Sequence, residues 1–273
     1  MSWRESLRSY VRTYYDVQKL RVACANRLVQ AFLAENPEAK IGKKGRGISD
    51  RLIKSREFEL FVQRLEGSNP IAKLYRRLLD YEDAVMKAVE DMVSEHVMWP
   101  WLSSVKGVGS LHAAVILSEV DIEKADTISS LWKFAGYCPG PRPRRGEKRW
   151  YNAFLKRTLY LVGQRFIILK TQPYEEVYRS AKARYSARQD LKDAPKIRIH
   201  LMSMRKMIQV FLSHLWLLWR WKLGLSIRPP YPLEYLAHAD FIPVPNEDAD
   251  PDVRKVNDEV RKLIAEAKKR AGR

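Results

Sequence analysis

At residues 105–117 the chain reads VKGVGSLHAAVIL, an apolar segment that ends in Gly-Val-Gly and continues into small apolar residues. Gly107 and Gly109 permit positive φ and leave the backbone without a Cβ. The pattern predicts a helix-hairpin-helix whose turn amides and second-helix N-terminus point outward, an arrangement that favours an anion such as phosphate. The expected contacts are Lys106, Gly107, Val108, Gly109 and Ser110. An ordinary glycine turn between two core helices is the alternative.

The charge balance points to a polyanionic partner. Lys and Arg number 50 against 32 Asp and Glu, a net charge of +18, and nucleic acid is the first candidate for such a surplus. An anionic membrane and a merely solvated surface are the alternatives. The longest apolar stretch, Met207–Trp219, is too short to span a bilayer and predicts a buried core helix. Met1–Leu20 is charged throughout, so we expect no signal peptide and a cytoplasmic, nucleoid-associated protein without a membrane partner.

Cysteine and histidine give no sign of a metal or disulfide framework. Cys24 and Cys138 lie far apart without a C-x-x-C pattern, which fits a reducing compartment. The five histidines lack metal-ligand spacing, and His112 and His214 are expected in the core or a groove. We therefore expect no metal site and no cofactor.

Apolar periodicity predicts an all-α fold, in which a helical N-terminal hairpin or coiled coil precedes a helical domain containing the hairpin motif. Asn69 and Pro70 are typical of an N-cap and a first helical residue. A further helix is expected to be capped by Ser49 or Asp50 and to run to about Leu65. The other expected helices are Trp3–Leu33, a long helix from Pro70 that ends before Pro100, Ile128–Tyr137, Trp150–Thr171, Tyr174–Arg188, Ala194–Trp221 and a C-terminal helix from Asp252.

Four regions follow from these elements. Residues 1–98 form a helical assembly region, residues 99–225 the domain with the hairpin, residues 226–250 a proline-rich arm or linker, and residues 251–273 a C-terminal helix. The long N-terminal stripes could pair between chains as a coiled coil or within one chain as a bundle. We expect a homo-oligomer held by these helices.

A basic, proline-rich loop follows the hairpin region. Five of the nine residues 141–149 are basic, and three prolines and two glycines between residues 139 and 146 prevent a regular helix. Arginine forks bind phosphate oxygens, and a tryptophan at the end of the loop offers a stacking face. A second basic loop lies near residue 45. The expected nucleic-acid contacts outside the hairpin are Arg142, Arg144, Arg145, Lys148, Arg149, Trp150, Lys156, Arg157, Lys43, Lys44 and Arg46.

From residue 105 to about residue 221 the chain resembles the C-terminal domain of the DEDD-type insertion-sequence transposases, the bridge-RNA-guided recombinase family. The order of the elements carries the resemblance: a Gly-x-Gly hairpin, a small apolar helix, acidic residues, an "AYAGLxP" element, a basic loop and long helices rich in Leu and Arg. Here these elements are Lys106–Gly109, Ala113–Glu119, Asp121-Ile122, Phe134–Pro139, Arg142–Arg149, Phe154–Tyr160, Tyr174–Tyr185 and Lys206–Leu218.

The chain departs from this family at both catalytic centres. The family carries an N-terminal RuvC-like α/β domain with four metal-binding acids, whereas residues 1–100 contain no run typical of a buried strand, and Asp16, Asp50, Glu57 and Asp80 lie in helical contexts. The family's serine nucleophile belongs in the basic loop, but no Ser or Thr lies between Pro139 and Trp150. Tyr151 and Ser103 have no spacing that supports either as a substitute.

The sequence therefore predicts a transposase-derived DNA-binding protein that contacts mainly backbone and shape, and we expect it to be non-catalytic alone. Two alternatives stand beside this interpretation. One is an active transposase or recombinase subunit whose nuclease comes from a separate partner, and the other is an accessory protein that binds structured RNA. A cleavage assay with divalent metal separates the first, and competition between duplex DNA and structured RNA separates the second.

Overall fold

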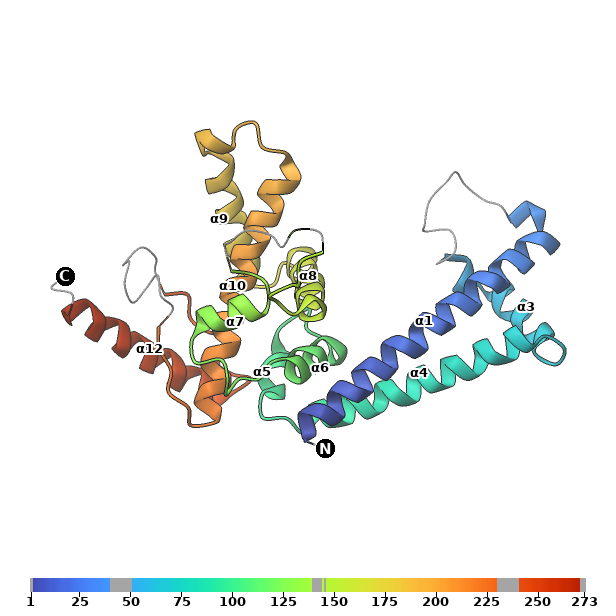
Figure 1. Ribbon diagram of the computed structural model, residues 1–273, viewed down its shortest axis with the longest axis horizontal. Helices are drawn as coiled ribbons and strands as arrows, with labels where there is room; N and C mark the ends of the chain where they lie inside the picture. Colours follow the sequence, from blue (N-terminus) through green and yellow to red (C-terminus); the bar gives the residue numbers. More distant parts are fainter. Residues whose placement is uncertain (1, 40–50, 139–143, 145, 230–240, 271–273) are drawn as a thin grey trace. The chain divides into compact units, whose positions relative to one another are not determined.

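The computed structural model describes residues 2–39, 51–138, 144, 146–229 and 241–270. These residues form helices and connecting turns, with no β-strand among them, which confirms the expected all-α fold. The chain divides into two compact units, Met1–Asp91 and Met92–Arg273. Figure 1 draws the helices of both units with their labels.

The first unit is a long antiparallel pair of helices with a short third helix. Helix α1 (Trp3–Glu35) begins with a capping box, because Ser2 and Glu5 satisfy each other's backbone amides. A 3₁₀ turn, η1 (Pro37–Ala39), follows it. Helix α4 (Pro70–Ser94) begins as expected, since the Asn69 side chain accepts from the amides of Ile71 and Ala72 at 2.8 and 3.3 Å.

The short helix of this unit, α3 (Arg56–Glu66), begins later than its sequence suggests. Ser55 accepts from the Phe58 amide at 3.2 Å and is the cap, so the expected start at Ser49-Asp50 is wrong for this helix. Residues 51–53 form a separate helical turn, and residues 49 and 50 lie outside the described residues. The aromatic rings of Phe32, Phe58, Phe61 and Tyr75 meet edge to face and form the centre of the core of this unit.

A polar cluster fixes how α1 and α4 pair. The Glu82 carboxylate on α4 accepts from Gln18 and is ion-paired with Arg21, both on α1. The pKa of the neighbouring Tyr14 is raised to about 12 by burial and by Glu82. Side chains of Arg21 and Glu82 are 19% and 11% exposed, so a shifted register would leave charged groups partly buried without partners.

Replacing Glu82 with Ala is expected to lower the free energy of unfolding by about 2 kcal/mol, because Arg21 would then be left partly buried without its carboxylate. The matched control is Glu35→Ala, which removes an ion pair with Arg64 whose side chains are 50% and 63% exposed and should cost less than about 1 kcal/mol. Urea unfolding followed by circular dichroism measures both. Equal losses for the two variants would contradict this role of Glu82.

The second unit is built around α10 (Lys196–Lys222), whose C-terminal half is buried from Met207 to Arg220 apart from residue 210. This confirms the buried core helix expected at Met207–Trp219. Helix α9 (Tyr174–Ser186) runs beside the first half of α10, and α12 (Pro251–Arg270) lies near its second half (Figure 1). A 3₁₀ turn, η2 (Gln189–Leu191), joins α9 to α10.

Four further helices complete the second unit. They are α5 (Trp99–Ser104), α6 (Ser110–Glu119), α7 (Ile128–Phe134) and α8 (Ala153–Ile168). Helix α6 is buried from Ala113 to Glu119 and packs on α8, which itself contacts α10. Gly163 of α8 lies so close to α10 that a Cβ there would be 3.0 Å from the Ile208 side chain. The helices after the hairpin thus begin and end within a few residues of their expected positions.

Within the proline-rich segment, residues 241–250 form an ordered arm attached to three helices. Trp101 of α5 donates to the Pro245 carbonyl oxygen at 3.1 Å, and His214 of α10 bonds to the Ile242 carbonyl oxygen at 3.0 Å. Buried Asn257 of α12 pairs with both backbone groups of Val244 at 2.8 and 3.0 Å. Four backbone polar groups of the arm are thus satisfied by side chains from the helices.

Candidate nucleic-acid interface

The turn between α5 and α6 has the geometry of a hairpin. Gly107 has a φ of +99°, and a Cβ there would lie 2.9 Å from the Cβ of Arg165, so glycine is required both for the backbone and for the close approach. Thr171 donates to the Lys106 carbonyl oxygen at 2.8 Å and holds the turn against the end of α8. Val108 is buried, whereas Lys106 and Gly109 are exposed.

The N-terminus of α6 fits an anion. Gly109 is its N-cap and has no side chain, so the N-cap residue itself supplies no carboxylate or hydroxyl to the positive end of the helix. Lys106, Arg165 and Lys170 are exposed around the turn. The pKa of His112, in the first turn of α6, is lowered by burial and further by the positive charge of Arg165.

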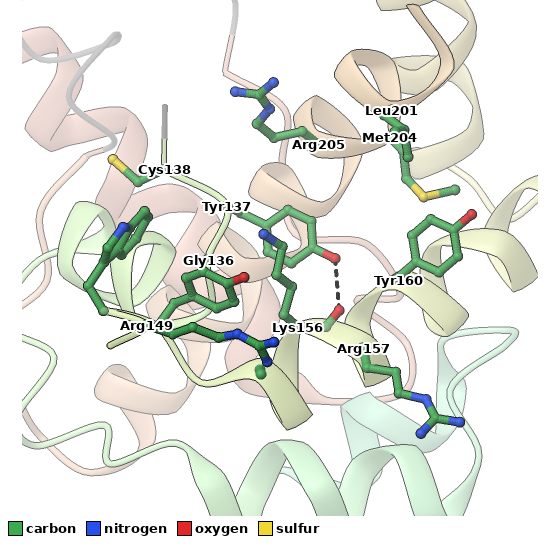
Figure 2. A pocket seen from close by; sticks show the side chains of 13 residues that line it. Gly136, Tyr137, Cys138, Arg149, Lys156, Arg157, Tyr160, Leu201, Met204 and Arg205 are labelled. Carbon is green, nitrogen blue, oxygen red and sulfur yellow. Dashed lines mark hydrogen bonds between the residues drawn. The ribbon is translucent and has the colours of Figure 1, made fainter. Parts of the chain in front are cut away.

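A second feature is a pocket of about 680 Å³ at the other end of α8 (Figure 2). Its lining combines four cationic and four aromatic side chains with a few small or apolar residues, and no Asp or Glu lines it. The lining residues are Gly136, Tyr137, Cys138, Arg149, Trp150, Tyr151, Ala153, Lys156, Arg157, Tyr160, Leu201, Met204 and Arg205.

The wall of the pocket is built by a close approach of the α7–α8 connection to α8. Gly136 has a φ of +73°, and a Cβ there would lie within 3 Å of both Tyr151 and Lys156. The Lys156 ammonium lies 4.2 Å from the centroid of the Tyr151 ring, and the Tyr137 hydroxyl donates to the Lys156 carbonyl oxygen at 3.1 Å. Asn152 caps α8 through the Leu155 amide and also donates to Glu119. This part of the pocket is therefore held in place before any ligand arrives.

Three arginines at this pocket have no acceptor in the part of the chain that the structure describes. Arg149, Arg157 and Arg205 form no hydrogen bond or ion pair with the residues that the structure describes. They come from the basic loop, α8 and α10 respectively, and Figure 2 shows the Arg205 and Arg157 side chains on different sides of the pocket. Each guanidinium carries five N–H donors, so the arrangement is suited to a ligand with several anionic oxygens.

Helix α8 connects the pocket with the hairpin turn. Arg157, Leu161 and Arg165 are exposed at intervals of four residues and therefore share one face. Arg157 lines the pocket and Arg165 lies against Gly107, so the two sites are about 12 Å apart along this face. We call the basic residues around this face the α8 track: exposed Lys106, Arg149, Arg157, Arg165 and Lys170, together with half-buried Lys156 and Arg205.

The structure brings together some of the residues singled out in the sequence. Arg149, Trp150, Lys156 and Arg157 share the pocket, and Lys106, Gly107, Val108, Gly109 and Ser110 form the turn at the other end of α8. Arg144 and Lys148 are exposed in the basic loop, where the Arg144 amide donates to Glu147. Five expected contacts lie outside the described residues, namely Lys43, Lys44, Arg46, Arg142 and Arg145.

Sequence reasoning missed Arg165, Lys170, Tyr160 and Arg205. Lys170 and Arg165 lie near the hairpin through contacts distant in sequence, among them the bond from Thr171 to Lys106, 65 positions away, and the packing of Arg165 on Gly107. Arg205 reaches the pocket from α10, in a segment whose apolar stripe indicated only a core helix. The sequence signal that could have identified Arg205 is its position one helical turn after Leu201, at the edge of the apolar stripe.

The residues considered as catalytic substitutes have structural partners. The Tyr151 ring is packed against Gly136 and Lys156, and the Ser103 hydroxyl donates to the Pro100 carbonyl oxygen at 3.2 Å. Asp16, Glu57 and Asp80 are exposed on three different helices. Within the described ranges no three His, Cys, Asp or Glu side chains are grouped so as to hold a metal ion. None of the helices described there is both long and apolar enough to cross a membrane.

Comparison with protein-family models, with curated proteins and with solved structures found no match for this chain.

Proposed function

We propose that this chain is a transposase-derived DNA-binding protein that contacts the phosphate backbone along the α8 track and has no catalytic centre of its own. The observation that carries the proposal is the pocket at the N-terminal end of α8, where four cationic side chains converge with no carboxylate among the lining residues. The net charge of +18 supports it, as does the order of elements shared with the transposase family.

The α8 track offers two kinds of hydrogen-bond donor to a phosphate. At one end the first turn of α6, which follows the glycine N-cap, and the exposed Lys106 suit a single phosphate, as helix N-termini do. At the other end Arg149, Arg157 and Arg205 present unused guanidinium donors. Contacts of this type fix the position of a backbone and carry little sequence information, so the expected binding is weakly selective for sequence.

Removing track arginines should weaken binding. Arg157→Gln and Arg205→Gln are each expected to lower the affinity for a duplex DNA roughly tenfold, because a charge-assisted phosphate contact is lost. The control is Arg261→Gln on α12, where the arginine already pairs with Asp258 at 3.0 Å and lies outside the track. Fluorescence anisotropy with a labelled duplex measures all three. An unchanged affinity in both track variants would contradict the proposed surface.

The proposal includes a homo-oligomer formed through the first unit. Helix α4 exposes Ile71, Leu74 and Tyr81 at intervals of three and seven residues, an apolar face that the helices of the unit leave uncovered. Full-length protein is expected to be a dimer or larger by light scattering at micromolar concentration, and the double variant Leu74→Glu, Tyr81→Glu should shift it to a monomer. A monomeric unmodified protein would contradict this expectation.

A further inference from the structure

We propose that the pocket at the N-terminal end of α8 receives a single unpaired base of the bound DNA, stacked on Trp150, while the arginines around the pocket hold the adjacent phosphates. This inference rests on the proposed DNA binding, and it adds that the protein prefers DNA with an extrahelical or unpaired nucleotide. The volume of the pocket, about 680 Å³, falls within the range of pockets that enclose small ligands.

The four aromatic residues do not play equal parts. Tyr137 is 7% exposed and its hydroxyl is bonded to the Lys156 carbonyl oxygen, so it belongs to the wall. Tyr151 is confined between Gly136 and Lys156. Trp150, in contrast, is 40% exposed and meets Tyr151 edge to face, at an interplanar angle of 79°. Since only an edge contact joins the two rings, Trp150 retains indole surface on which a base can stack.

The far side of the pocket is apolar. Tyr160 and Met204 face each other there (Figure 2), and Leu201 beside them is 38% exposed. The pocket thus combines an indole, an apolar side and unpaired guanidinium groups. A nucleotide has the same division between a flat, weakly polar base and an anionic phosphate, and it matches these surfaces without requiring any carboxylate.

A base within an intact duplex cannot use such a pocket, because it is stacked and paired inside the helix. Extruding it costs unpairing and unstacking energy, and that cost is smallest where the nucleotide is already unpaired. A duplex with one bulged nucleotide should therefore bind more tightly than the same duplex fully paired. The gain should come from the base itself and not from the bend that a bulge introduces.

The test uses the full-length protein and three duplexes of one sequence: fully paired, with a single bulged adenosine, and with an abasic residue at the bulge. The adenosine bulge is expected to bind roughly tenfold more tightly than either of the others, the effect of one stacked base. In Trp150→Ala the ratio between the adenosine and abasic bulges should fall to about one, and in Trp150→Phe it should largely remain.

Cys138 provides an independent readout of pocket occupancy. It lines the pocket and is half-buried, whereas Cys24, the other cysteine of the chain, is 2% exposed. Alkylation of Cys138 should be slowed by the adenosine-bulge duplex and much less by the paired duplex, with each DNA at a saturating concentration.

The outcomes separate this inference from the function on which it rests. If none of the three duplexes is bound in a salt-dependent way, the proposed function is overturned, and the inference with it. Binding of all three duplexes with equal affinity would leave the proposed function standing and overturn the inference. So would an adenosine preference that survives in Trp150→Ala, or equal protection of Cys138 by the bulged and paired duplexes.

Discussion

Raising the salt concentration from about 50 to about 200 mM is expected to lower the affinity of this protein for duplex DNA by roughly 10³. The α8 track and the described end of the basic loop together present about as many cationic groups as the six to ten phosphates for which such a loss is typical. Each neutralised phosphate releases a counterion, so the logarithm of the binding constant should fall linearly with the logarithm of the salt concentration. Anisotropy titrations at four salt concentrations measure the slope.

The variants sharpen this measurement. Arg157→Gln should reduce the magnitude of the slope of log K against log salt by about one, the value for one lost phosphate contact. Arg261→Gln should leave the slope unchanged, because Arg261 lies on α12 and pairs with Asp258. The basic-loop variant, in which Arg142, Arg144, Arg145, Lys148 and Arg149 are all changed to Glu, should lose most of the binding. A nearly flat salt response, or undiminished binding by that variant, would refute the electrostatic surface proposed here.

The fold could be predicted from the sequence because its signals are local. Apolar residues at helical spacing marked α1, α8, α9 and α10, and the Asn69-Pro70 pair marked the start of α4. The exception is α3, for which the sequence predicted a start at Ser49 or Asp50. The cap is Ser55, whose side chain accepts from the Phe58 amide, and a break at residues 54 and 55 separates α3 from the helical turn before it.

The candidate site was less predictable because it depends on contacts distant in sequence. Half of the pocket lies in a continuous stretch from Arg149 to Arg157, which its basic and aromatic composition made visible. The remaining lining residues are Gly136, Tyr137 and Cys138 after the end of α7, Tyr160 on α8, and three residues of α10. The element Phe134–Pro139 was singled out in the sequence, but the positive φ of Gly136 and its contact with Tyr151 could not be derived from it. Charge alone also could not distinguish Arg205, which faces the pocket, from Arg220, which donates to the carbonyl oxygens of Ile122 and Ala125 inside the fold.

The stability of the second unit should fall steeply as the pH falls from about 6.5 towards 4, because His214 is buried in its neutral form. Its Nδ1 lies 3.0 Å from the Tyr174 hydroxyl, and its Nε2 lies 3.0 Å from the Ile242 carbonyl oxygen. A carbonyl oxygen only accepts, so Nε2 carries the proton and Nδ1 accepts from Tyr174. Burial in these surroundings lowers the pKa of His214 to about 4.

The direction of the pH effect follows from this depressed pKa. The unfolded chain takes up a proton on His214 near its ordinary value of 6.5, whereas the folded chain does so only near 4, so the unfolded state binds more protons between these values. The contribution of neutral His214 to the free energy of unfolding is fully present above about pH 6.5. Below that pH it declines by about 1.4 kcal/mol per pH unit, and about 3 kcal/mol is lost by about pH 4. His96, whose pKa burial also lowers to about 4, adds to the slope.

Urea unfolding at several pH values between about 7.5 and 5 measures the effect above the range in which most carboxylates titrate. In His214→Gln, which keeps a donor and an acceptor, stability at neutral pH should fall, but the pH slope should shrink to the contributions of His96, His112 and His200, whose pKa values burial also lowers. The loss should appear first where the arm is attached, because the Ile242 carbonyl oxygen is one of the points that hold residues 241–250 to α10. Hydrogen exchange of the Val244 amide, which donates to buried Asn257, would report that release. A slope identical in the variant and the unmodified protein would show that His214 does not titrate on unfolding and that the neutral-ring assignment is wrong.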